Sequence, residues 1–134
     1  MAETTRRWIK ALRSGEYQQG TCHLRIPGEP YDKYCCLGVL CEIIGFPIRL
    51  RQEVEYKIGE QWWNDLVPSS ILPEVFKRGV TCNYRGISQD VMKTLIGMND
   101  NYRSFSSIAD FIEKVVSVKY GTILNEVEDD RKDT

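Results

Sequence analysis

The 134-residue chain has no long hydrophobic run, no strong net charge and only one histidine. Its most apolar stretch, residues 37–44, is interrupted by Glu42 and stopped by Gly45 and Pro47, so it is far too short for a membrane span. The first residues contain no hydrophobic signal core, and a formal net charge of −1 gives no general attraction to nucleic acid. We therefore expect a soluble, cytoplasmic protein without membrane contact and without extended nucleic-acid binding.

Metal and phosphate signatures are missing as well. No cysteine pair has the Cys-x₂-Cys spacing of structural zinc sites, and neither the Gly-x₄-Gly-Lys-Ser/Thr loop nor the Gly-x-Gly-x₂-Gly fingerprint occurs. We expect no metal and no cofactor. The five cysteines are an odd number, which together with the missing secretion signal indicates reduced thiols.

The length and composition of the chain fit one globular domain. A chain with 42% hydrophobic and 28% charged residues is neither disordered nor fibrous in composition, and 134 residues are enough to bury a core without disulfides. Residues 126–134 contain five acids and two bases and almost no core-forming side chains. We expect a single domain over residues 1–125 and a disordered acidic tail over residues 126–134.

Two helices are predicted in the first half of the chain from apolar spacing and end signals. Residues 5–14 place Trp8 and Leu12 on one face and stop at Gly15. Residues 34–44 are apolar nearly all round, which is typical of a helix in the centre of a domain. Gly38 lowers the stability of that helix, so we expect it to allow another element to approach closely.

Two further helices are expected near the C-terminus. One is capped by Ser88, runs to residue 96 and is closed by Gly97. The other is capped by Ser104 or Ser107 and has apolar residues at 3.6-residue spacing over residues 105–115.

Strand signals are short. Residues 22–26 and 54–58 alternate apolar and polar side chains and are expected to pair with each other, while residues 71–76 suggest a short helix with Pro73 in its first turn. The prediction is an α+β fold, with four or five helices around a central apolar helix at about 34–44 and a small antiparallel sheet.

Two strings in the sequence carry a family resemblance. The string WIKALRSGEYQQ at residues 8–19 and the string YCCLGVLC at residues 34–41 resemble a family of small proteins of bacteriophages and bacterial genomes. Segments similar to residues 95–100 and 104–113 occur toward the end of its members, and the resemblance is weakest over residues 46–85. Since the family has no agreed activity, the resemblance implies a phage setting but no mechanism.

The segment after the first helix supplies groups suited to a phosphorylated ligand. A guanidinium can hold a phosphate, an aromatic ring can stack on a base, and amides can read its edge. The alternative remains open that Gly15 caps the helix, Tyr17 packs on Trp8 and the glutamines satisfy loop backbone. The candidate ligand-binding residues are Arg13, Ser14, Tyr17, Gln18, Arg25, Tyr34, Cys35 and Cys36.

Two other groups of residues suggest different roles. Trp62 and Trp63 are candidate partner-binding residues, and alternation along a strand would bury one of them and expose the other. Cys35 or Cys36 at a helix N-terminus, with His23 as base, would suit a small hydrolase or transferase.

The function expected from the sequence is a non-catalytic binding protein encoded by a phage. It would bind a host protein or sequester a small phosphorylated ligand, in counter-defence or host takeover. The sequence is compatible with a homodimer and does not decide the oligomeric state. No catalytic residue is assigned in this reading, and the cysteine-dependent enzyme is the alternative.

Overall fold

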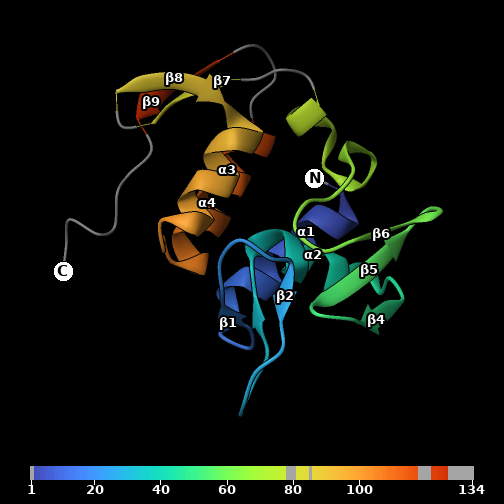
Figure 1. The fold of residues 1–134 in the computed structure, drawn as a ribbon. Coiled ribbons are helices and arrows are strands. Elements are labelled where there is room, and N and C mark those ends of the chain that lie inside the picture. Colours follow the sequence, from blue (N-terminus) through green and yellow to red (C-terminus); the bar gives the residue numbers. More distant parts are fainter. Residues whose placement is uncertain (1, 78–80, 85, 118–121, 127–134) are drawn as a thin grey trace.

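The computed structural model describes residues 2–77, 81–84 and 86–117, and the backbone of residues 122–126 (Figure 1). The described chain is an α+β fold in which helices form the centre and small sheets lie around them. None of the described helices is both long enough and apolar enough to cross a membrane.

Four α-helices and two short 3₁₀ turns are present in the described residues. The helices are α1 (Glu3–Arg13), α2 (Cys36–Ile44), α3 (Val91–Asp100) and α4 (Phe105–Val116), and the 3₁₀ turns are η1 (Ser69–Ile71) and η2 (Glu74–Lys77). Helix α1 packs against both α2 and α4, and α3 packs against α4.

The strands form three separate three-stranded sheets, where the sequence predicted one antiparallel sheet. The first sheet has the order β1-β3-β2, from β1 (Gln18–Gln19), β2 (Arg25–Ile26) and β3 (Lys33–Tyr34). The second has the order β4-β5-β6, from β4 (Ile48–Leu50), β5 (Val54–Ile58) and β6 (Gln61–Trp63). The third has the order β8-β7-β9, from β7 (Thr81–Tyr84), β8 (Ile87–Asp90) and β9 (Thr122–Glu126). The β1–β3 and β7–β9 pairs are parallel, so two of the sheets are mixed.

Helix α2 is the central helix that its apolar sequence predicts. Its first six residues are all buried, and the indole nitrogen of Trp8 in α1 donates a hydrogen bond of 2.8 Å to the carbonyl of Cys36. A Cβ atom placed on Gly38 would lie 1.7 Å from the carbonyl oxygen of Leu24. The expected close approach at Gly38 is therefore confirmed, and the neighbouring segment is the backbone around Leu24.

The predicted strand over residues 22–26 is wrong in extent and in pairing. Only Arg25 and Ile26 are extended in a ladder, and they pair with β3 rather than with residues 54–58. Cys22 has a φ of 71°, in the left-handed region, so it cannot continue a strand. Strand β5 instead lies between β4 and β6 in its own sheet.

The helix predicted from Ser88 begins and ends later than expected. Residues 87–90 pair with β7 as strand β8, and Asp90 caps α3 by accepting hydrogen bonds from the backbone N–H groups of Met92 and Lys93. Gly97 lies inside α3 and does not close it. The cap at Ser104 of α4 is as predicted.

The acidic tail predicted over residues 126–134 lies outside the described residues, apart from Glu126, whose backbone ends β9.

Candidate functional site

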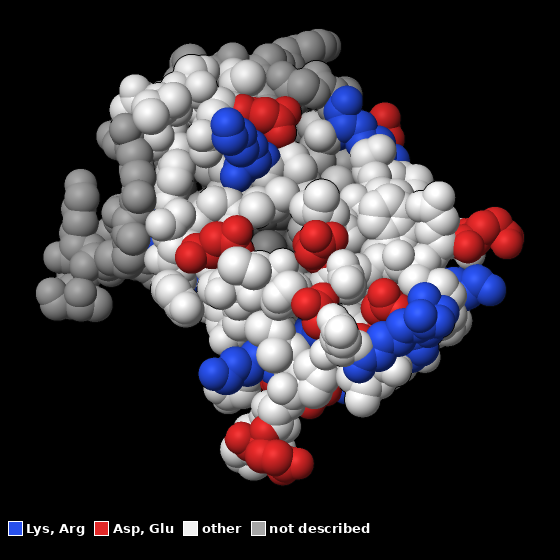
Figure 2. Space-filling model, in the orientation of Figure 1, with Lys and Arg blue, Asp and Glu red and all other residues white. Residues whose placement is uncertain are grey.

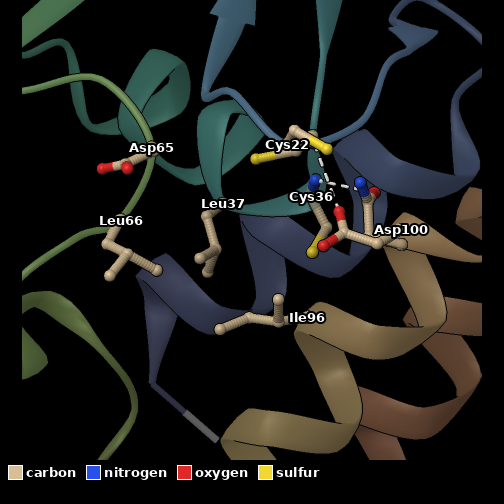
Figure 3. A pocket seen from close by; sticks show the side chains of 9 residues that line it. Cys22, Cys36, Leu37, Asp65, Leu66, Ile96 and Asp100 are labelled. Carbon is tan, nitrogen blue, oxygen red and sulfur yellow. Dashed lines mark hydrogen bonds between the residues drawn. The ribbon is translucent and has the colours of Figure 1, made fainter.

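A pocket of about 210 Å³ opens where the N-terminus of α2, the C-terminus of α3 and two loops meet. Three of its lining residues are cysteines, and we call it the cysteine pocket. Figure 3 shows Leu37 and Ile96 toward its floor, Leu66 on one side and Asp100 on the other. The lining residues are Cys22, Cys35, Cys36, Leu37, Asp65, Leu66, Ile96, Asn99 and Asp100.

The two cysteines at the start of α2 are placed by the helix cap. Cys35 has an extended backbone and caps the helix, and its sulfur accepts a hydrogen bond of 3.4 Å from the N–H of Gly38. A thiol is a weak acceptor for this position, where serine, threonine and aspartate are more usual. Cys36 begins the helix and is 1% exposed, so its side chain belongs to the core as much as to the pocket.

Asn99 holds the floor of the pocket together. Its side-chain oxygen accepts a hydrogen bond of 3.1 Å from the backbone N–H of Cys36, and its side-chain nitrogen donates one of 2.9 Å to the carbonyl of Gly20. Gln19 donates to the same oxygen at 3.3 Å and to the carbonyl of Arg103 at 2.6 Å. This network joins β1, α2 and the end of α3, because each partner comes from a different segment.

Asp100 and Cys22 form the rim beside this network. The carboxylate of Asp100 accepts a hydrogen bond of 3.2 Å from the backbone N–H of Cys22. This bond holds the left-handed residue in place, and Cys22 is the exposed one of the five free thiols.

The buried thiols of the pocket are held in their neutral form. Burial raises the pKa of Cys35 to about 11, and burial raises the pKa of Cys36 well above its ordinary value. The nearby Asp100 carboxylate acts in the same direction on both. At neutral pH neither sulfur is a thiolate, which is the form that attacks electrophiles or binds metals.

The charged residues of the pocket are acidic. Among the residues that the structure describes, the charged ones that line it are Asp65 and Asp100. Figure 2 shows acidic atoms on both sides of a hollow near the centre of the face that it draws. Within residues 2–77, 81–84 and 86–117, no group of three or more histidine, cysteine or carboxylate side chains is placed to hold a metal ion.

The residues predicted to bind a phosphorylated ligand lie in three places. Cys35 and Cys36 line the cysteine pocket, whereas Arg13 and Ser14 line a wider groove along α1. The guanidinium of Arg13 is bound there by two carboxylates of α4, Asp110 at 2.6 Å and Glu113 at 3.1 Å. The hydroxyl of Ser14 donates to the carbonyl of Ala11 and so ends α1.

Three more of the predicted ligand-binding residues meet beside the first sheet. Tyr17 packs edge-on against Tyr34 at 5.1 Å between ring centroids, whereas the alternative placed it on Trp8, whose ring lies beside that of Phe76. Arg25 lies 5.2 Å from the centre of the Tyr34 ring, on its face, and forms a 2.8 Å ion pair with Asp32.

Arg25 is held by a second carboxylate, that of Glu42, at 3.3 Å. The hydrogen bond from Arg25 lowers the pKa of Asp32, as expected for a partly buried ion pair. Gln18, the last of the set, is exposed on β1.

Both candidate partner-binding tryptophans are half-buried, where alternation predicted one buried and one exposed. Trp62 is covered by Arg49, whose guanidinium lies 4.3 Å from the ring centre. Trp63 packs against the core from β6, opposite Tyr56 of β5.

His23, the base of the alternative enzyme, is directed elsewhere. Its Nδ1 lies 3.2 Å from a carboxylate oxygen of Glu53, and His23 does not line the cysteine pocket.

Several pocket residues carried no signal in the sequence. Asp65, Leu66 and Ile96 belong to segments that are far apart along the chain from α2, and their spacing matches no motif. Asn99 and Asp100 belong to the short polar run Asn99-Asp100-Asn101, whose composition is typical of a turn and does not mark a pocket.

One protein-family model matches a part of the chain that contains the whole site. The model for Domain of unknown function (DUF8296) matches residues 1–116, which include the four helices and every residue that lines the cysteine pocket. No curated protein and no solved structure matches the chain significantly. The chain therefore belongs to the DUF8296 family.

Proposed function

We propose that this protein is a non-catalytic binding protein that acts on another protein through the face carrying the cysteine pocket. In the phage setting that the sequence resemblance implies, the partner is a host protein in the cytoplasm, and the role is counter-defence or host takeover.

The observation that carries this proposal is the make-up of the pocket. Leu37 and Ile96 form its apolar floor, which the Asn99 network holds in place, Leu66 forms a side wall, and two carboxylates lie at its rim. A volume of about 210 Å³ is below the roughly 300–1,000 Å³ of sites for drug-sized ligands. A rigid hollow of this size suits one side chain inserted by a partner protein.

Sequestration of a phosphorylated ligand has less support. Arg13 and Arg25, the two guanidinium groups predicted to hold the phosphate, are each paired with two carboxylates. A phosphate would have to displace those carboxylates and enter a site that is already neutralised.

The cysteine-dependent enzyme also has less support. Cys35 and Cys36 are buried and protonated at neutral pH, and the Nδ1 of His23 lies against Glu53. The activated thiolate and the adjacent base that such catalysis needs are not brought together by these contacts.

The test compares two matched variants of the full-length protein. Leu66 and Leu50 are both exposed, at 49% and 67%, but only Leu66 lines the pocket. The wild type, Leu66→Glu and Leu50→Glu are purified gently from infected or expressing host cells and examined by native mass spectrometry. We expect a retained protein partner with the wild type and with Leu50→Glu, and loss of that partner with Leu66→Glu.

Two other outcomes would contradict the proposal. Retention of a species of a few hundred daltons, lost on denaturation, would favour the phosphorylated ligand. Equal retention of the partner by Leu66→Glu would place the contact away from the pocket. The same spectra report whether the chain is a homodimer.

A further inference from the structure

We infer that the cysteine pocket receives a basic side chain, lysine or arginine, from the protein partner. This inference rests on the proposed function and names the chemistry that the pocket selects.

The charge at the pocket is negative, and among the residues that the structure describes no cationic side chain forms an ion pair with it. Within the described part of the chain, neither Asp65 nor Asp100 lies within ion-pair distance of a lysine, arginine or histidine. Other carboxylates do have such partners, among them Asp110 and Glu113 beside Arg13. A cation that enters the pocket therefore meets a carboxylate that is free to pair.

The two carboxylates are not equivalent. Figure 3 shows the carboxylate of Asp100 turned toward Cys22 and Cys36, whereas that of Asp65 is directed away from them at the outer edge. Asp100 also has one oxygen fixed by the N–H of Cys22, so its position is set before any ligand arrives. Asp100 is the direct partner of the cation, and Asp65 adds a weaker, longer-range attraction.

The remaining lining fits the stem of a long basic side chain. Leu37 and Ile96 form an apolar floor, Leu66 forms a side wall, and the amide of Asn99 already has three hydrogen-bond partners. Lysine and arginine bury their methylene stems against apolar surface while the charged end stays near water and carboxylates. A purely apolar side chain would fill the same space but leave the carboxylate of Asp100, which accepts one hydrogen bond from the N–H of Cys22, without a cationic partner.

The test uses small capped amino acids as probes. Nα-acetyl-lysine N-methylamide and Nα-acetyl-norleucine N-methylamide have similar stems, but only the first carries a cation. Each is titrated at millimolar concentration into the ¹⁵N-labelled full-length protein. We expect the lysine probe to shift the amide signals of Cys22, Leu37 and Asp100, and to bind at least about threefold more tightly than the norleucine probe.

Neutral variants locate the charge. Asp100→Asn keeps the oxygen that accepts from Cys22 but removes the charge, and we expect lysine-probe binding to weaken by about threefold or more. Asp65→Asn is expected to have a smaller effect, and Glu60→Gln, at an exposed carboxylate outside the pocket, none. Thermal melts check that each variant is folded. If Asp100→Asn does not fold, the difference in affinity between the two probes for the wild type still tests the inference.

The inference is overturned if the lysine probe leaves the pocket signals unchanged, or if the norleucine probe binds as tightly. Either result would leave the proposed function standing as long as Leu66→Glu still loses the partner protein. If that variant keeps its partner, the proposed function fails whatever the probes do.

Discussion

Asn99 joins three segments of the chain through the two ends of one side-chain amide. It is 2% exposed, and its oxygen and nitrogen reach the N–H of Cys36 and the carbonyl of Gly20, 63 and 79 residues away. If this amide is removed, the N–H of Cys36 and the carbonyl of Gly20 lose a hydrogen-bond partner. Buried polar groups without such partners lower the stability of the fold. The position of the α2 N-terminus beside the pocket depends on it.

Replacing Asn99 by alanine should therefore destabilise the protein strongly. We expect the free energy of unfolding, measured by urea denaturation, to fall by about 3 kcal/mol. Gln18→Ala, at an exposed neighbour of the network, should change it by less than about 0.5 kcal/mol. A loss below about 1 kcal/mol for Asn99→Ala would mean that the network does not fix the pocket floor.

The five cysteines differ sharply in exposure, so we expect their thiols to differ in the rate of alkylation. Cys22 is exposed and the other four are buried. With iodoacetamide at pH 8 we expect one thiol to react quickly, and peptide mapping should identify it as Cys22. Cys22→Ser should remove the fast phase. Fast labelling of Cys35 or Cys36 in the folded protein would instead support the alternative function, a cysteine-dependent enzyme.

At the scale of elements, α2 and the segment around Leu24 are in direct backbone contact. The Leu24 carbonyl accepts from the N–H of Cys35 at 3.2 Å and lies where a Cβ of residue 38 would be. Glycine at this point of the helix is therefore a packing requirement, although it lowers helix propensity.

A pair of glycine substitutions tests this contact. Gly38→Ala forces the backbone of Leu24 to move, and we expect a loss of about 3 kcal/mol or more in the free energy of unfolding, or failure to fold. Gly97→Ala, inside α3 with no atom near the new Cβ, should stabilise by about 0.5–1 kcal/mol. Urea denaturation measures both. Equal effects of the two changes would contradict the close approach.

The helices were predictable from the sequence because their signals are local. The spacing of Trp8 and Leu12, the apolar run of α2 and the cap at Ser104 each act within a few residues. Ser88 misled the prediction because Asp90 is a second cap and residues 87–90 are held as β8 by pairing with β7.

Strand pairing and the pocket depend on contacts between distant segments. Residues 22–26 alternate like a strand, but the hydrogen bond from Cys22 to Asp100 bends the chain there. Of the pocket, the sequence predicted Cys35 and Cys36 from their place at a helix start. Asp65, Leu66 and Ile96 could not be found, because no local pattern records which loops a fold brings together.

For the whole molecule, the buried thiols should make the free energy of unfolding decrease at alkaline pH. Burial raises the pKa of Cys35 to about 11 and of Cys41 to about 12, and raises that of Cys36 as well, whereas the unfolded thiols keep an ordinary value near 9. Between pH 9 and 11 the unfolded chain therefore binds fewer protons than the folded protein. The free energy of unfolding must then decrease as pH rises through this window, and it is unaffected by these thiols below about pH 8.

Urea denaturation at pH 8, 9, 9.5 and 10 measures this dependence. Burial raises the pKa of Cys82 too, so four buried thiols take part. Each thiol contributes up to about 1.4 kcal/mol per pH unit above its unfolded pKa, so together they should lower the free energy of unfolding by several kcal/mol near pH 10. Cys41→Ala should make the decrease shallower by about a quarter to a third, whatever it does to stability at pH 8. A stability that stays level up to pH 10 would mean that the thiols around α2 are hydrated, and that the helix does not form the dry centre on which the pocket is built.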